Sequence, residues 1–202
     1  MDKVLPIVAL VLAGLGLLWF FVPILSGIPW VPSSKRRIHK ALELAGLQPG
    51  EKFYDLGCGD GRVLIAAVRQ HGARAVGIEI SPLHCLAAWL RTRAAGAGRQ
   101  VSIVWGNFNQ IDLSDADVVY QYGLSRYAEK LSRQLERQLR PGARLVSITV
   151  DLPGWQPQAV DREDLIFLYR MPPTPGDIAS FMLQESDAGE KETPLPVRRK
   201  GE

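Results

Sequence analysis

The sequence predicts an α/β domain, a mostly parallel sheet covered by helices on both faces, preceded by one transmembrane helix. Three observations lead to this prediction. Runs of β-branched and aromatic residues alternate with segments whose apolar residues recur at helical spacing. A glycine-rich turn joins the first such run to a helical segment, and an uncharged apolar stretch precedes both. The chain has 202 residues, enough for one membrane segment and one domain of roughly 150 residues.

Continuous apolar strands are typical of a parallel sheet that is buried on both faces. After the fifth strand two short strands follow without a helix between them, which indicates an antiparallel hairpin at the sheet edge. The predicted strands are residues 52–54, 75–80, 101–105, 118–122, 144–150, 159–160 and 165–169.

Helices are expected between these strands. Ser33 or Ser34 can cap the first, which Gly46 ends. The second follows the glycine turn, and a fourth is expected near 127–139. The third begins at Pro82 and carries Leu83, Leu86, Ala87 and Leu90 as its apolar residues, and the three histidines, His39, His71 and His84, are expected at the surface.

Three parts of the chain are expected: an anchor at residues 1–28, a domain at 29–171 and a disordered tail at 172–202, which is rich in Pro, Gly, Glu and Lys. The net charge of +3 is too small to indicate a nucleic-acid partner. Cys58 and Cys85 are the only cysteines, so no disulfide framework is expected. No zinc-ligand spacing exists, and no metal is expected.

The glycine turn carries most of the functional information. Phe53–Arg62 reads F-Y-D-L-G-C-G-D-G-R, and a strand, a glycine turn and a helix in this order direct backbone N–H groups at a ligand. The G-x-G-x-G spacing, with Arg62 in place of a third glycine, differs from a dinucleotide fingerprint. The acids Asp55 and Asp60 would repel pyrophosphate and suit an ammonium group instead.

Glu79 ends the next strand, where a carboxylate can accept hydrogen bonds from both hydroxyls of a ribose. An adenosine joined to an amino acid satisfies all of these acids, which indicates S-adenosylmethionine. The alternative is a glycine turn that binds no ligand.

No charged residue occurs from Val4 to Ser34, a stretch long enough to cross a bilayer core of roughly 30 Å as a helix. A cleaved signal peptide is the alternative, but the run ends in aromatic residues suited to a membrane interface rather than in a cleavage site. The positive-inside rule places the domain in the cytoplasm, or an equivalent reducing compartment, because basic residues follow the span: Lys35, Arg36, Arg37 and Lys40.

The glycine turn, Glu79 and the G-N-F sequence at 106–108 resemble the class I, seven-stranded S-adenosylmethionine-dependent methyltransferases, over about Lys35 to Arg170. P-W-V-P at 29–32 and G-W-Q-P at 154–157 narrow the resemblance. They are similar to segments of the archaeal broad-specificity protein-lysine methyltransferase. They also resemble the membrane-anchored mitochondrial lysine methyltransferases of the adenine nucleotide translocase and the ATP synthase c subunit.

The resemblance implies a Rossmann-like sheet and a set of site residues. The residues expected to bind the cofactor are Asp55, Gly57, Gly59, Asp60, Glu79, Asn107 and Phe108, with the last two at the adenine. The segments P-W-V-P and G-W-Q-P would border the methyl-acceptor channel, whose candidate catalytic walls are Trp30, Tyr120 and Trp155. An aromatic, apolar channel would favour the neutral lysine amine that attacks the methyl group. Ordinary core packing is the alternative role for these aromatic residues.

Three functions remain open from the sequence. The first is a membrane-anchored protein-lysine methyltransferase whose anchor restricts it to membrane-associated substrates. The second is a methyltransferase for a lipid or another small molecule. The third is a membrane protein that binds the cofactor without turnover.

Overall fold

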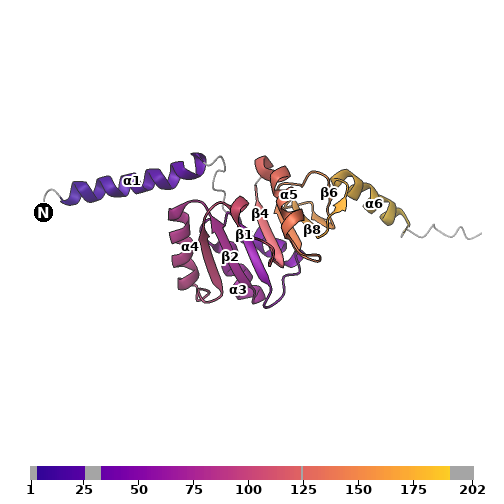
Figure 1. Cartoon of the computed structure of the whole chain (residues 1–202), viewed down its shortest axis with the longest axis horizontal. Coiled ribbons are helices and arrows are strands. Elements are labelled where there is room, and N and C mark those ends of the chain that lie inside the picture. Colours follow the sequence, from indigo (N-terminus) through magenta and orange to yellow (C-terminus); the bar gives the residue numbers. More distant parts are fainter. Residues whose placement is uncertain (1–3, 26–32, 124, 192–202) are drawn as a thin grey trace, which may run out of the picture.

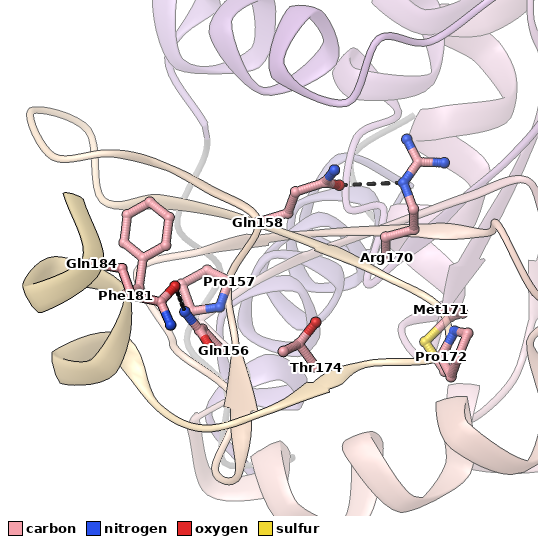
Figure 2. A pocket seen from close by; sticks show the side chains of 9 residues that line it. All are labelled: Gln156, Pro157, Gln158, Arg170, Met171, Pro172, Thr174, Phe181 and Gln184. Atoms are coloured by element: carbon pink, nitrogen blue, oxygen red, sulfur yellow. Dashed lines mark hydrogen bonds between the residues drawn. The ribbon is translucent and has the colours of Figure 1, made fainter. Parts of the chain in front are cut away.

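The computed structural model describes residues 4–25, 33–123 and 125–191 (Figure 1). Its main sheet has seven strands in the order β3-β2-β1-β4-β5-β8-β7. The pairs from β3 to β5 are parallel, and β8 pairs antiparallel with both β5 and β7. The predicted mostly parallel sheet with an antiparallel terminal hairpin is therefore confirmed. The strands are β1 (Lys52–Leu56), β2 (Arg74–Glu79), β3 (Val101–Trp105), β4 (Val118–Tyr122), β5 (Arg144–Ile148), β7 (Ala159–Asp161) and β8 (Ile166–Arg170).

Helices cover both faces of this sheet. Buried residues of α2 and α3 pack on one face together with Ala88 of α4, and buried residues of α5 pack on the other. The two clusters meet the alternating side chains of the strands, since Phe53 and Tyr120 belong to one and Tyr54 and Val119 to the other. The helices are α1 (Val4–Leu25), α2 (Lys35–Leu44), α3 (Arg62–His71), α4 (Pro82–Ala94), α5 (Ala128–Gln138) and α6 (Ile178–Lys191).

Local signals explain where α2 and α4 begin. The Ser34 hydroxyl accepts a hydrogen bond from the Arg37 N–H, and the Ser81 hydroxyl accepts one from the His84 N–H. Pro82 follows Ser81 at the first helical position, where its missing N–H costs nothing. Ser34 and Pro82 therefore begin these helices as the sequence predicts.

The outer face of α4 differs from the expectation. Leu86 and Leu90, predicted on its apolar face, are exposed, whereas His84, predicted at the surface, is buried together with Ala88 and Thr92. The reason is the close approach of α4 to the glycine turn. A Cβ on Gly61 would lie 3.1 Å from the Ala88 Cβ, so a larger side chain at position 88 would clash with the glycine turn.

The segment after residue 171 also differs from the predicted disordered tail. β9 (Thr174–Pro175) pairs antiparallel with β6 (Trp155–Gln156), and α6 follows it. Ile178 of α6 packs against the buried cluster on the α5 face. The segment therefore makes an apolar contact with the domain, which its Pro-, Gly-, Glu- and Lys-rich composition did not indicate. Residues 192–202 lie outside the described residues.

The predicted anchor region contains α1, whose described apolar side chains, such as Leu5 and Leu10, are exposed. Among the residues that the structure describes, no helix combines the length and hydropathy required for a membrane crossing. Trp30 and the rest of the P-W-V-P segment lie outside the described residues.

Candidate active site

The carboxyl ends of β1 and β2 bring two predicted site residues, Asp55 and Glu79, to one edge of the sheet, and Tyr120 in the middle of β4 lies beside Asp55. Asp55 on β1 is in register with Gly77 of β2 and with Tyr120 of β4. Glu79 is the last residue of β2. In open α/β sheets this edge is where ligands bind.

The glycine turn between β1 and α3 is held against β2. The N–H groups of Gly57 and Cys58 both donate to the Ile78 carbonyl oxygen, at 2.8 and 3.0 Å. Gly57 has φ +90°, which disfavours any side chain, and a Cβ there would meet no heavy atom within 4 Å. The backbone at Gly57 therefore faces open space, as the close approach of a ligand requires.

Asp55 is a buried acid with an unused acceptor. It is 3% exposed, and its Oδ2 accepts no hydrogen bond from the described residues. Burial, and then the charges of Glu79 and Asp60, raise the pKa of Asp55 well above its usual value. A buried acceptor without a donor is costly, so this carboxyl group is suited to an ammonium group brought by a ligand.

Glu79 is oriented by two backbone donors. Its Oε2 accepts from the Gly59 N–H and its Oε1 from the Ser81 N–H, both at 2.9 Å. Each carboxylate oxygen retains a further acceptor site, which suits two adjacent hydroxyl groups of a ribose. Glu79 and Gly59, both predicted to bind the cofactor, are therefore in direct contact, which joins the end of β2 to the glycine turn.

Asp60 lies in the same turn but already has partners. Arg62 donates to both of its oxygens, with Nη2 2.7 Å from Oδ2, and Arg91 of α4 also donates to Oδ2. Burial would raise the pKa of Asp60, but the hydrogen bonds of Arg62 and the charges of both arginines outweigh it and lower that pKa. The carboxylate that sequence reasoning assigned to an ammonium group is therefore bound to two guanidinium groups, and its contact with cofactor stays a prediction.

Asn107 and Phe108 follow β3 at the same edge. The Gly106 N–H donates to the Glu79 carbonyl oxygen at 2.9 Å, which holds this loop beside the end of β2. Asn107 caps a short 3₁₀ helix, Phe108–Gln110, by accepting from the Asn109 N–H. The Phe108 ring packs edge-on against Tyr127 with centroids 5.9 Å apart. These positions are compatible with the predicted adenine contacts.

Tyr120 is buried on the α2–α3 face, where its ring packs against Phe53. Its hydroxyl lies 3.2 Å from Ser33 Oγ, and burial raises its pKa above that of a free tyrosine. Ser33 directly follows the P-W-V-P segment. Tyr120 thus approaches the chain that was predicted to border the acceptor channel, although Trp30 itself lies outside the described residues.

Trp155 lies on the opposite face of the sheet from Tyr120. It is buried in the cluster on the α5 face, its ring is edge-on to Tyr169, and its Nε1 donates to Glu136 at 2.7 Å. These contacts give the indole a packing role, and its place in an acceptor channel stays a prediction.

Sequence reasoning missed the contacts of Arg62 and Ser33. Ser33 was considered only as a possible helix cap and Arg62 only as a departure from a dinucleotide fingerprint, yet Arg62 Nη1 donates to the Ser33 carbonyl oxygen at 3.2 Å. The opposite charges of Asp60 and Arg62, two positions apart, could have predicted the ion pair between them. Contact with Ser33 depends on the tertiary fold and had no signal in the sequence.

A second acidic group lies in the β7–β8 turn. Carboxylate oxygens of Asp161, Glu163 and Asp164 lie within 4.8 Å of one another, but Lys40 Nζ is 2.8–3.0 Å from all three residues. Arg36 also pairs with Glu163 and Asp164. The charge of this group is thereby balanced by α2.

Comparison with known proteins shows the family. The model of the ANTKMT methyltransferase domain matches residues 55–159. A protein-lysine N-methyltransferase of Saccharolobus islandicus (strain REY15A) is 37% identical over 134 residues, covering 66% of this chain and 83% of that protein. The adenine nucleotide translocase lysine N-methyltransferase of Mus musculus is 35% identical, over 73% of this chain and 65% of its own length.

A solved structure has the same fold. It is described as an RNA methyltransferase from Salinibacter ruber in complex with S-adenosyl-L-homocysteine, and it has a TM-score of 0.69 and 38% identity. The match covers 72% of this chain and 97% of that one. The open glycine turn, the unpaired Asp55 oxygen and the strand-end Glu79 are suited to this type of cofactor. The chain belongs to the ANTKMT methyltransferase domain family and is an S-adenosylmethionine-dependent methyltransferase.

Proposed function

We propose that this chain methylates lysine side chains of protein substrates while anchored to a membrane by its N-terminal helix, with the domain in the cytoplasm or an equivalent reducing compartment. The observation that carries the proposal is the arrangement of Asp55, Gly57 and Glu79 at one sheet edge, in a chain whose relatives include proteins named as lysine N-methyltransferases.

The residues of the chain bind and orient both reactants. Asp55 would hold the ammonium group of the cofactor, Glu79 its ribose hydroxyls, and Asn107 and Phe108 its adenine. The cofactor supplies a methyl group on a sulfonium, which an amine can displace directly. Alignment of two bound reactants accounts for about 7–11 kcal/mol of a barrier in favourable cases.

The acceptor amine must lose its proton before it attacks. A lysine in water has a pKa near 10.4, and apolar surroundings lower that pKa because they disfavour the charged form. Tyr120, buried and neutral beside Ser33, lies at the end of the segment that would border the acceptor. We assign it a place in the wall of that channel rather than a proton-transfer role, since burial raises its pKa.

Membrane anchoring is supported by the uncharged stretch from Val4 to Ser34 and by the basic residues that follow. Two of those basic residues have a structural role as well, because Lys40 and Arg36 pair with the acidic group of the β7–β8 turn. The other activities that the sequence left open are methylation of a lipid or small molecule, and cofactor binding without turnover. The Salinibacter ruber relative adds RNA as an acceptor to be tested.

One assay distinguishes these acceptors. The full chain in phospholipid vesicles is incubated with methyl-labelled cofactor and, separately, membrane protein, lipid extract and RNA. We expect label in protein, recovered as methyl-lysine after acid hydrolysis. Label in lipid or RNA, or cofactor binding without transfer to any acceptor, would contradict the lysine assignment.

The matched control is a pair of glutamate variants. Glu79→Ala removes the ribose acceptor and should abolish measurable transfer, whereas Glu129→Ala, on the exposed surface of α5, should leave it unchanged. Circular dichroism checks that both remain folded. Anchoring is tested separately, by extraction of the vesicle-bound chain at alkaline pH. A chain released into the supernatant would exclude an integral anchor.

A further inference from the structure

The outer face of helix α4 carries large apolar side chains that are exposed to solvent. Leu86, Trp89 and Leu90 follow helical i, i+3, i+4 spacing and are 54, 43 and 52% exposed. Its inward face carries His84, Ala88 and Thr92. Three of the large apolar side chains of this helix therefore point outward, unlike those of an amphipathic helix, whose apolar residues face the core.

The exposed apolar surface continues onto the neighbouring strand. Trp105, at the end of β3, is 70% exposed, and its Nε1 donates to the carbonyl oxygen of Ile80, itself exposed. Ile80 lies just before Ser81, the cap of α4, and α4 packs on β3. The α4 patch is defined here as Ile80, Leu86, Trp89, Leu90 and Trp105.

Packing inside the domain does not account for these residues. Gly61 of the cofactor turn lies so close to Ala88 and Thr92 that these two positions of α4 have no room for larger side chains. Leu86, Trp89 and Leu90 point outward instead, where leucine and tryptophan add nothing to the core. Large exposed apolar residues gathered on one helix and on the strand end beside it mark an interaction site.

The charge around the α4 patch indicates its partner. No acidic residue occurs between Glu79 and Asp112, while Arg93 and Arg99 follow the apolar stripe in addition to Arg91, which is paired with Asp60. The Arg93 guanidinium lies 4.0 Å from the centroid of the Trp89 ring, and Arg99 is exposed nearby in the sequence. Leucine and tryptophan bordered by arginine, without acids, match the interface of an anionic lipid bilayer.

We propose that the α4 patch rests on the surface of the bilayer that holds α1, with Trp89 and Trp105 in the headgroup region. This inference rests on the proposed anchoring. Residues 26–34 join α1 to α2, and a chain of that length reaches at most ~30 Å, about the diameter of a small domain. The anchor therefore holds the domain within reach of the membrane surface.

Docking would also bear on the cofactor site. Arg91 extends from α4 to Asp60 in the glycine turn, so α4 connects the lipid-facing surface to the residues that border the cofactor. The bilayer would then fix the orientation of the active site relative to membrane substrates, in addition to its distance from them.

Tryptophan emission tests the docking. The full chain carrying Trp19→Phe and Trp30→Phe is placed in vesicles of phosphatidylcholine with about one third phosphatidylglycerol, with or without brominated acyl chains. Emission then comes from Trp89, Trp105 and the buried Trp155. We expect bromination to quench part of this emission, and Leu86→Glu with Leu90→Glu to lose most of the quenching while the chain still floats with the vesicles.

The matched control is Leu165→Glu with Leu183→Glu, two exposed leucines outside the α4 patch, which should retain the quenching. If the chain floats with the vesicles but its tryptophan emission is not quenched, or is quenched equally in both double variants, the docking proposal alone is overturned. A cross-linked dimer that forms through the patch and disappears with Leu86→Glu and Leu90→Glu overturns it as well. A chain that does not float overturns the anchoring and, with it, the docking.

Discussion

Ser33 Oγ lies 3.2 Å from the Tyr120 hydroxyl, a contact that joins the segment before α2 to the middle of β4 across 87 positions in the sequence. The backbone carbonyl of Ser33 also accepts from Arg62, which binds Asp60 in the glycine turn. Ser33, which follows the P-W-V-P segment, is therefore held both by Tyr120 of β4 and by Arg62 beside the glycine turn.

Tyr120→Phe tests the first of these contacts. Loss of one neutral hydrogen bond should lower the free energy of unfolding by about 0.5–1.5 kcal/mol. We expect Ser33→Ala to have a similar effect, and both variants to raise the KM for the acceptor more than that for the cofactor. Urea unfolding and steady-state kinetics measure the two effects. A far larger loss of kcat in Tyr120→Phe than in Ser33→Ala would show that the phenol itself touches the acceptor.

Asp55→Asn should stabilise the cofactor-free domain while it weakens cofactor binding. The folded-state pKa of Asp55 is raised, so the native state retains a proton that the unfolded chain releases, and stability falls as pH rises above about 3.9. The gain from Asn should therefore appear at about pH 7 and vanish near pH 4, below which Asp55 is protonated in both states.

Urea unfolding at the two pH values, with calorimetry for cofactor affinity, measures this prediction. Asp151→Asn, at an exposed carboxylate, is the control and should change neither quantity. An Asn variant that is less stable than the wild type at neutral pH would disprove the account of Asp55 as a destabilising buried acid.

Gly57→Ala and Gly142→Ala separate backbone strain from ligand approach. The two glycines have φ +90° and +87°, and an added Cβ would meet nothing within 4 Å at either position. Each substitution should cost about 1–2 kcal/mol of stability, because a Cβ disfavours this left-handed backbone. Only Gly57→Ala should also reduce cofactor affinity, since its methyl group occupies the space that a cofactor would need. Equal affinities by calorimetry would remove Gly57 from the binding site.

Trp155→Phe tests whether this indole acts in packing or in acceptor binding. The variant keeps an aromatic ring beside Tyr169 but loses the N–H donor to Glu136, so stability should fall by about 1 kcal/mol. We expect unchanged kinetic constants for both substrates at a temperature where the variant is folded. A raised acceptor KM without loss of stability would place Trp155 in the channel after all.

The sheet could be predicted because its signals are local. Buried parallel strands appear as continuous apolar runs, and the succession of β7 and β8 without a helix between them indicated the antiparallel edge. Asp55 and Glu79 could be predicted as neighbours because the carboxyl ends of adjacent parallel strands meet at one edge. These inferences need only the order of elements, not their detailed packing.

The inner face of α4 and the partners of Asp60 could not be predicted in this way. Both depend on how closely α4 approaches the glycine turn, which is decided by Gly61 against Ala88 and by the reach of Arg91. Composition also misled the prediction for residues 172–191, since a few apolar residues such as Ile178 suffice when a buried cluster is available to receive them.

The central place of β1 in the sheet has a consequence for folding. β1 pairs with β2 nearby in sequence but also with β4, and the Lys52 N–H reaches the Asp117 side chain across 65 positions. Closing so long a loop is slow compared with local pairing. Tyr120 meets Asp55 only after that closure, so a chain that has paired β1 with β2 alone lacks the proposed acceptor wall. Acceptor binding would therefore require the β1–β4 pairing, whereas Asp55 and Glu79 need only the local β1–β2 pairing.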